Sequence, residues 1–488
     1  MVWWAELSHG SLHMTTYRYP SLFATILLFA GCDASDGERP QPQPTFGEGL
    51  AAIEEPYQAV YYETPIELRG VVTGPDGAPL AGATVSAQGL TTTTLPDGTF
   101  TLSGLTRRTS FATFEAEGHR QESVAVWLHQ PLAEDTLDVG TVSLAADTED
   151  VARFLFTGDV SLGRRFLSSE PPIDRVPPDD PDALITVSDA ARTTGPILAG
   201  MRPYLQAADF ASINLETVVT DEPDTPFEQK PYVFFTLPGS LDALTAAGVD
   251  YAALANNHMY DYLEKGVVDT LEHLTARDLP HSGAGATPDA AFAPYRTTVR
   301  GADYSMISVC SIDGSQYPIL FVADEEKGGA AYAWDSDRFS AVLAAERAAG
   351  RVPVVNIHTG SEYTELPVES SHGRMLFAAE AGAALVIAHH PHVPQGLQWH
   401  GGSLIAHSLG NFIFDQERLE TVLGLLVRVD MRGDAVAGAR AIPVYLENFV
   451  PRAIAGPLAD VFLRRIAQAV ADGAGPRVAC RIRPVGRR

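Results

Sequence analysis

Three histidines stand within four positions in the stretch ALVIAHHPHVPQG, residues 384–396, directly after a run of apolar residues. Imidazole can bind a metal ion or transfer a proton near neutral pH. We therefore begin with this cluster as the first candidate for chemistry.

Four further groups of polar side chains follow apolar runs between residues 150 and 365. In chain order, these groups are Asp159; Asn214 and Glu216; Asn257, His258 and Asp261; and His358 and Glu362. In open α/β sheets, ligands bind outside the carboxyl ends of the strands. A single polar residue at a strand end has an ordinary explanation as a turn residue. Five such groups at successive strand ends predict one shared crevice.

The donor atoms of these groups belong to carboxylates, amides and imidazoles, with no thiolate among them. Such donors suit Mn, Fe or Zn better than copper or an iron–sulfur centre. Two ions about 4 Å apart need roughly six to eight ligands, one of them a bridging carboxylate. The number of donors permits a binuclear centre without requiring one.

The elements that must position these groups are typical of an α/β fold, because apolar runs alternate with helical patterns from about residue 150. The expected strands are 151–158, 210–216, 249–256, 304–311, 352–358, 384–390, 403–409, 424–431 and 441–447. The expected helices are 264–278, 336–350, 371–382 and 457–473.

Residues 64–146 have a different pattern, with short alternating β-runs separated by Pro-Asp-Gly turns. This pattern predicts a small all-β sandwich. The stretch Gly70–Val85 resembles the carboxypeptidase regulatory-like module, on the strength of Gly77, Pro79, Leu80, Gly82 and Ala83. Because it has no cluster of His, Cys or paired carboxylates, we interpret it as a spacer or adhesion module, with carbohydrate binding as the alternative.

The pattern of the first 63 residues is typical of an export signal followed by a tether. The apolar run at 21–31 follows Arg18 and is too short to span a bilayer with ease, which favours a cleaved signal. Its ending, Phe29 to Cys32, resembles a bacterial lipobox, in which Cys32 would carry the lipid. An ordinary secretory signal is the alternative, and translation could start at Met1 or Met14. Residues 33–49 are polar and rich in Pro and Gly, as expected of a flexible tether, and we assign residues 33–63 to it.

The net charge and the cysteine positions exclude several classes of binding partner and site. The 488 residues carry a formal net charge of −27, which argues against general attraction to nucleic acid or to an anionic membrane surface. Three cysteines lie far apart, at 32, 310 and 480, so neither a thiolate metal site nor a disulfide framework is indicated. Residues 456–488 are expected to form a helix and a solvated basic tail.

Six ordered motifs resemble those of the CapA family of bacterial poly-γ-glutamate capsule biosynthesis proteins. They are GDVSLGR at 158–164, NLE at 214–216, NNHMYDYLEKG at 256–266, HTGSEY at 358–363, HHPHVPQG at 389–396 and SLGNFIFD at 408–415. The resemblance implies a branch of the calcineurin-like metallophosphoesterases, with a four-layer α/β/β/α sandwich over residues 150–455. The chain departs from the family pattern at Leu263, Thr359 and Ala388, where the family commonly has Gly, Trp and Gly.

The same resemblance implies roles for the ligands of two divalent ions, Mn, Fe or Zn. Asp159 would bind the first ion, Glu216 would bridge, and Asn257 with His358 would bind the second. His390 and His392 would complete the two sites, with His389 as an alternative to His390.

His258 would protonate the leaving group or steady transition-state charge, and Asp261 is grouped with it as a catalytic candidate. Arg164 and Glu362 could orient an anionic substrate or a neighbouring imidazole, although a surface salt bridge explains each of them nearly as well. Asn411 is either a structural cap or a wall of the site.

Two hypotheses follow for the function. The first is an extracytoplasmic, membrane-anchored, metal-dependent hydrolase or transferase of capsule synthesis that acts on a phosphoester or an anionic polymer. The second is a non-catalytic scaffold whose metal site guides the polymer during synthesis or export. Capsule-synthesis proteins are the expected partners in either case.

Overall fold

The computed structural model describes residues 65–108, 110–126, 135–171 and 174–472. All of the described residues belong to one compact unit. The expected signal peptide with Cys32, the tether at 33–63 and the basic tail lie outside the described residues. Among the helices that are described, none combines the length and the apolar character needed to cross a membrane.

Residues 66–143 form two β-sheets that share one core. The three-stranded sheet has the order β4 (Thr99–Leu105), β1 (Ile66–Thr73), β7 (Thr136–Ser143), and the four-stranded sheet has the order β3 (Leu90–Thr93), β2 (Thr84–Ala87), β5 (Ser110–Glu115), β6 (Glu122–Val126). Phe100 of the first sheet packs edge-on against Phe114 of the second, at 5.6 Å between ring centres. Since apolar side chains from both sheets line this core, the predicted all-β character is confirmed.

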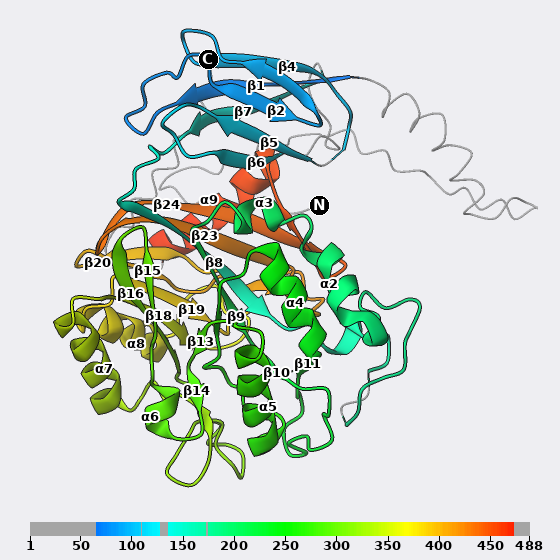
Figure 1. Ribbon diagram of the computed structural model, residues 1–488, viewed down its shortest axis with the longest axis vertical. Helices are drawn as coiled ribbons and strands as arrows, with labels where there is room; N and C mark the ends of the chain where they lie inside the picture. Colours follow the sequence, from blue (N-terminus) through cyan, green and yellow to red (C-terminus); the bar gives the residue numbers. More distant parts are fainter. Residues whose placement is uncertain (1–64, 109, 127–134, 172–173, 473–488) are drawn as a thin grey trace, which may run out of the picture. The chain divides into compact units, whose positions relative to one another are not determined.

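Two larger sheets follow (Figure 1). The eight-stranded sheet has the order β13 (His281–Ser282), β12 (Tyr251–Ala253), β9 (Phe210–Leu215), β8 (Val151–Val160), β23 (Leu423–Arg432), β24 (Ala435–Glu447), β25 (Val450–Ala453), with β22 (Asn411–Ile413) also paired to β8. The six-stranded sheet has the order β15 (Tyr295–Val299), β16 (Ala302–Cys310), β18 (Val352–His358), β19 (Leu385–His389), β21 (Ser403–Ala406), β20 (Leu397–His400). Two short pairs complete the described strands: β10 (Val218–Val219) with β11 (Phe235–Thr236), and β14 (Ala284–Gly285) with β17 (Gly329–Ala330).

The two large sheets bury a common apolar cluster between them. In β8, Phe154 and Phe156 face this cluster, whereas Leu155 faces away from it. In β19, Leu385 and Ile387 face the cluster in the same alternating way. A strand that is apolar on both faces must be covered on both sides, and helices provide the outer cover.

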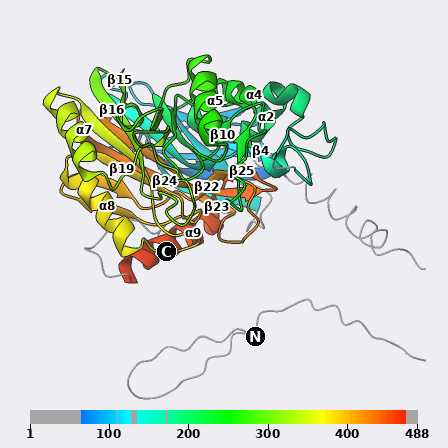
Figure 2. The same cartoon turned by 90° about the horizontal axis from the view of Figure 1, so that it is seen from below.

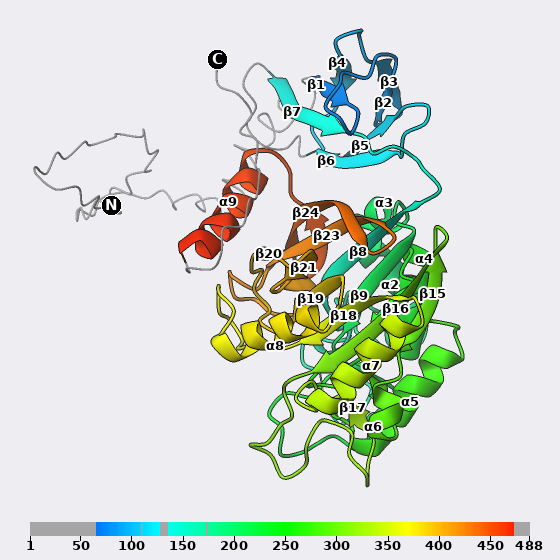
Figure 3. The same ribbon diagram turned by 90° about the vertical axis from the view of Figure 1, so that its left-hand side faces the viewer.

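The helices fall into two sets that lie on opposite sides in Figures 1 and 2. Packed on the outer face of the eight-stranded sheet are α2 (Ala190–Leu198), α3 (Arg202–Leu205), α4 (Pro238–Ala247) and α5 (Leu263–Thr275). Packed on the six-stranded sheet are α6 (Pro288–Ala291), α7 (Ser336–Ala348) and α8 (Glu369–Glu380). The last helix, α9 (Gly456–Asp472), lies beside β24 and adds Phe462 to the core between the sheets (Figure 3).

Two 3₁₀ turns, η2 (Arg164–Phe166) and η3 (Val187–Asp189), complete the described elements. The predicted mixed α/β class is therefore confirmed. The finer assignment to a metallophosphoesterase-type sandwich, and the predicted domain boundaries, remain predictions.

A buried carboxylate ties α7 to the outer face of the six-stranded sheet. Glu346 is 2% exposed, pairs with Arg296 at 2.7 Å and with Arg351, and accepts a hydrogen bond of 2.5 Å from the Ser305 hydroxyl. Burial alone would raise the pKa of Glu346, but these hydrogen bonds outweigh it and lower the pKa from 4.5 to about 2.

Glu346→Gln is expected to destabilise the fold by about 2 kcal/mol at neutral pH. Because the folded pKa lies below the unfolded value, the stabilisation is complete above about pH 5 and is lost as the pH falls from 4.5 toward 2. Urea unfolding of both proteins at pH 7, 5, 4 and 3 would test this, with the exposed Glu149→Gln as control. A difference between wild type and Glu346→Gln that stays constant over this range would contradict the account.

Candidate metal centre

The register of the strands brings the predicted polar groups to one edge of the two large sheets. In the eight-stranded sheet, Asp159 of β8 lies opposite Asn214 of β9 on one side and opposite Asn411 of β22 on the other. In the six-stranded sheet, His358 at the end of β18 lies opposite His389 at the end of β19. All of these pairings are parallel, so the carboxyl ends of neighbouring strands coincide, as the sequence predicts.

The first group of potential ligands consists of Asp159, Glu216 and His392, whose donor atoms all lie within 4.8 Å of one another. Nδ1 of His392 lies 3.2 Å from Oδ2 of Asp159, and its Nε2 lies 3.7 Å from Oε1 of Glu216. Both carboxylates are fully buried. Asn411 Oδ1 lies 2.9 Å from His392 Nδ1, so a proton on Nδ1 would leave Nε2 free as the ligand atom.

The second group consists of Glu216, His358 and His390. Nε2 of His358 lies 3.6 Å from Oε1 of Glu216 and 3.1 Å from Nδ1 of His390. Oδ1 of Asn257 lies 2.7 Å from the same Nε2. Glu216 therefore belongs to both groups, which is the place that the sequence predicts for a bridging ligand.

The two carboxylate oxygens of Glu216 test whether these groups fit a cation. Both are buried, and neither accepts a hydrogen bond from any described residue. Burial, together with the negative charge of Asp159, raises the pKa of Glu216 well above its usual range. A buried, unpartnered carboxylate beside a second carboxylate is costly unless a positive charge lies between them. The residues present thus fit a divalent metal.

The structure separates His390 from His389. His390 is a member of the second group, whereas His389 Nδ1 lies 3.3 Å from Asp159 Oδ1 and neither ring nitrogen forms a hydrogen bond among the described residues. The backbone at His390 and His392 has φ values of 99° and 57°, a region that side-chain-bearing residues rarely adopt. Strain of this kind is typical of functional sites, where it aims particular side chains.

His390→Ala is therefore expected to lower metal content by one ion per chain, whereas His389→Ala keeps the wild-type content. Elemental analysis of the two purified variants checks this difference. If His389→Ala loses the ion and His390→Ala retains it, the assignment of His390 to the second group is wrong.

His258 lies beside the two ligand groups, and Asp261 and Phe234 hold its ring in place. Its Nδ1 lies 2.6 Å from Oδ2 of Asp261, and its ring stacks on Phe234 with 3.9 Å between ring centres. Its Nε2 lies 3.9 Å from Oε1 of Glu216, so this nitrogen faces the metal groups. Burial, followed by the charge of Lys230, lowers the pKa of His258 well below its usual value. Asp261 thus fixes the ring with Nε2 directed at the site.

Lys230 is a site residue that sequence reasoning missed. Its Nζ donates hydrogen bonds to the backbone oxygen of Asn257 at 2.7 Å and to Oδ1 of Asp261 at 2.5 Å, and lies 3.1 Å from Nδ1 of His258. Burial raises the pKa of Asp261 to about 7, against the opposing charge of Lys230. Lys230 therefore compensates a carboxylate that has no access to solvent.

The remaining candidates lie farther from the donors. Arg164 pairs with Asp415 at 3.2 Å, and its guanidinium lies 5.0 Å from the centre of the Phe234 ring that stacks on His258. Its side chain is 27% exposed, so part of the guanidinium remains available. Glu362 is exposed and belongs to neither ligand group.

Comparisons with known proteins agree with this geometry. A family model described as "Bacterial capsule synthesis protein PGA_cap" matches residues 153–416, and one described as "Carboxypeptidase regulatory-like domain" matches residues 67–143. The first match contains every residue of the two ligand groups.

Three curated relatives resemble the chain. The capsule biosynthesis protein CapA of Bacillus anthracis is 28% identical over 265 residues, which are 52% of this chain and 62% of that protein. The PGA biosynthesis protein CapA of Bacillus subtilis (strain 168) is 25% identical over 305 residues, 62% of this chain and 74% of that protein. A probable polyglutamine synthesis accessory protein of Mycobacterium tuberculosis is 28% identical over 219 residues, 43% of this chain and 57% of that protein. The chain thus spans less than two thirds of the first and third of these relatives.

Proposed function

The chain belongs to the family of bacterial capsule synthesis proteins described as PGA_cap, and from this premise we propose that it serves poly-γ-glutamate capsule synthesis as a metal-dependent hydrolase or transferase. The names of the relatives from the two Bacillus species refer to capsule or PGA biosynthesis. The observation that carries the enzymatic part is the buried carboxylate of Glu216, which lies between two groups of donors and has no hydrogen-bond partner among the described residues.

The proposed centre holds two ions. Asp159, Glu216 and His392 would hold the first, and Glu216, His358, His390 and the amide oxygen of Asn257 would hold the second. Oxygen and imidazole donors favour Mn, Fe or Zn. The proposed fold is the four-layer metallophosphoesterase-type sandwich, which two sheets around a common core with helices on both outer faces would build.

Ions held there would act as Lewis acids and supply a nucleophile from water at neutral pH. The chain's own residues would handle the leaving group. His258 presents Nε2 to the site, where this nitrogen would take up the proton released by the attacking water and pass it to the departing oxygen or nitrogen. Asp261 accepts the hydrogen bond from Nδ1–H and so fixes the orientation of the ring. Lys230 donates a hydrogen bond to the other carboxylate oxygen of Asp261 and so helps to hold it in place.

Arg164 is the proposed contact for an anionic group of the substrate. Its side chain is partly exposed, and its guanidinium contacts the Phe234 ring on which His258 stacks. Arg164 shares Asp415 with Arg165, and Arg165 also pairs with Glu417 at 2.7 Å, so the four charges of this cluster balance. The exposed part of the Arg164 guanidinium would offer charge-assisted hydrogen bonds to a phosphoryl or carboxylate group.

The proposal places the protein outside the cytoplasm, anchored through a lipid on Cys32. The support is the short apolar run that ends at this cysteine. Cys32→Ser is expected to move the protein from the membrane fraction to the soluble extracytoplasmic fraction, as immunoblots of fractionated cells would show. An unchanged membrane fraction would contradict a lipid anchor at this position.

The enzymatic proposal is tested with the purified full chain, after metal analysis, on a panel of phosphomonoesters, phosphodiesters and oligo-γ-glutamate. We expect turnover of at least one class, its loss on treatment with a chelator, and its return on addition of Mn, Fe or Zn. Absence of turnover across the panel in protein that carries two ions would favour the scaffold hypothesis instead.

A further inference from the structure

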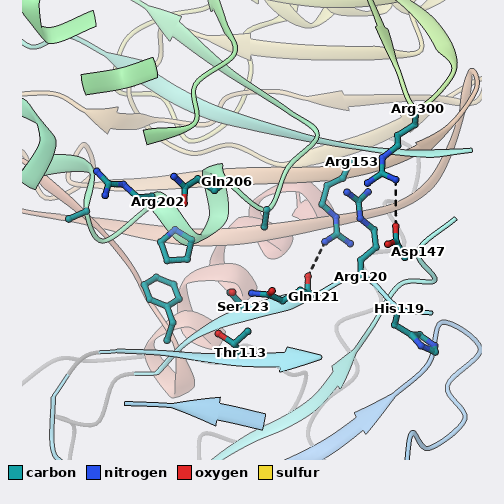
Figure 4. Close-up of a pocket in the computed structure, with 14 residues that line it drawn as sticks. Thr113, His119, Arg120, Gln121, Ser123, Asp147, Arg153, Arg202, Gln206 and Arg300 are labelled. Carbon is teal, nitrogen blue, oxygen red and sulfur yellow. Dashed lines mark hydrogen bonds and ion pairs between the residues drawn. The ribbon is translucent and has the colours of Figure 1, made fainter. Parts of the chain in front are cut away.

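A cavity of about 570 Å³ lies at the other end of β8, where strands of the β-sandwich meet the larger sheets (Figure 4). Ser123 of β6 and Thr113 of β5 line it from the sandwich, and Arg153 of β8 with Arg202 of α3 line it from the larger region. Six residues of extended strand separate Arg153 from the ligand Asp159, a distance of about 20 Å. The cavity is therefore not part of the metal centre.

Arginines dominate the walls of this cavity. Arg120, Arg153, Arg202 and Arg300 all line it. Arg120 and Arg300 share a single carboxylate, Asp209, at 2.8 and 3.0 Å.

The ion pairs of Arg153 and Arg300 decide the net charge of the cavity. Arg153 pairs with Asp430 at 2.8 Å, and Arg300 also lies 3.7 Å from Asp147. Four guanidinium groups thus face three carboxylates, so the cavity keeps a positive charge in a chain whose net charge is −27. Such a local excess attracts anions that the rest of the surface repels.

Several donors of the cavity are not used by the fold. The guanidinium of Arg202 is exposed and has neither a hydrogen bond nor an ion pair with any described residue. The hydroxyl of Ser123, a residue that is only 6% exposed, has no hydrogen-bond partner in the described part of the chain either. The side-chain amide of Gln206 also lines the cavity without a described partner. Buried polar groups usually have partners, so the unused hydroxyl of Ser123, beside the free donors of Arg202 and Gln206 in the same cavity, points to a ligand.

We propose that this cavity binds a carboxylate-bearing segment of poly-γ-glutamate and so holds the polymer while the metal centre acts on another part of it. The identity of the ligand rests on the proposed function. The planar guanidinium group matches a carboxylate with two parallel hydrogen bonds. Ser123 and Gln206 supply neutral donors for the amide oxygens of the same chain. The volume of the cavity is in the range of roughly 300–1,000 Å³ that is typical of ligand sites.

The test is a calorimetric titration of the full chain with an oligo-γ-glutamate of ten residues. It is made in a Glu216→Gln background, so that neither turnover nor the metal centre contributes to the signal. Arg202→Gln is expected to weaken binding about tenfold, because one charge-assisted pair is lost. Arg464→Gln removes an exposed arginine of α9 that has no described partner, and it is expected to leave the affinity within about twofold. Both substitutions change the net charge equally.

Equal affinity of wild type and Arg202→Gln would overturn the proposal, as would an equal loss in the Arg464→Gln control, which would indicate general electrostatics. Inorganic tripolyphosphate forms the second arm of the titration. If it competes for the Arg202-dependent site and binds more tightly than the oligo-γ-glutamate, the site is a phosphate site and the assigned ligand is wrong. Because the background variant has no metal-dependent turnover, a failure of this binding test is distinct from a failure of the proposed reaction.

Discussion

Glu216→Gln is expected to remove both metal ions and, with them, all turnover. The amide has nearly the same shape as the carboxylate but no charge, and Glu216 is the one residue that both ligand groups contain. Its loss leaves two donors in the first group, Asp159 and His392. In the second group it leaves His358 and His390, with the amide oxygen of Asn257. Elemental analysis should therefore show a fall from about two ions per chain to less than one, and activity should fall to that of chelated protein.

Glu346→Gln is the matched control for this result. It removes an equally buried carboxylate that pairs with arginines on the far side of the six-stranded sheet. This variant is expected to keep both ions at neutral pH despite its lower stability. A Glu216→Gln protein that still carries two ions would exclude Glu216 as the shared ligand.

His258→Asn is expected to keep both ions and to lose turnover by about 10²- to 10⁴-fold on a substrate with a poor leaving group. A nitrophenyl ester leaves as a stable anion and needs no proton, so the same variant should lose much less turnover on it. Measurement of kcat on an alkyl and a nitrophenyl phosphodiester separates proton donation from a general loss of structure. Asp261→Asn should show the same dependence on the leaving group with a smaller loss, since it acts by orienting the ring.

His407→Asn is the control for the His258 experiment. His407 is likewise buried, but it bonds to Gln398 within the six-stranded sheet and belongs to neither ligand group. Its substitution should leave the ratio of the two rates unchanged. Equal losses of His258→Asn on both substrates would remove the role of His258 as proton donor, and so would an unchanged rate on both.

The sequence predicted the convergence of the site because parallel strands end at the same edge of a sheet. Asp159, Asn214 and His358 were each found after an apolar run, and register alone brings their strand ends together. Both family resemblances predicted from motifs are confirmed by the matches at 153–416 and 67–143.

The sequence patterns did not predict one site residue, the placement of two histidines and two helices. Lys230 lies in the loop between β10 and β11, nearly thirty residues before His258, and no periodicity marks it. The different placement of His389 and His390 follows from positive φ values at His390 and His392, just beyond the end of β19, which no sequence pattern marks. Helix α4 was missed because its buried residues occupy more than one face, and α2 because it contains Pro196.

The departures from the family pattern lie around the donors. Leu263, the first residue of α5, has a φ of 53°, the conformation that a glycine would adopt without strain, and its side chain packs against the core. Thr359 accepts a hydrogen bond from the Ser311 hydroxyl at 2.7 Å. Neither residue belongs to a ligand group, so we expect these changes to affect the fit of the substrate more than metal binding.

The most direct test of the central claim is anomalous diffraction from crystals of the full chain, recorded at the absorption edges of Mn, Fe and Zn. The account predicts two peaks about 3.5–4 Å apart, one on each side of the Glu216 carboxylate, with Asp159 and His392 at the first and His358 and His390 at the second. A crystal of active protein with no peak within bonding distance of Glu216 would contradict it.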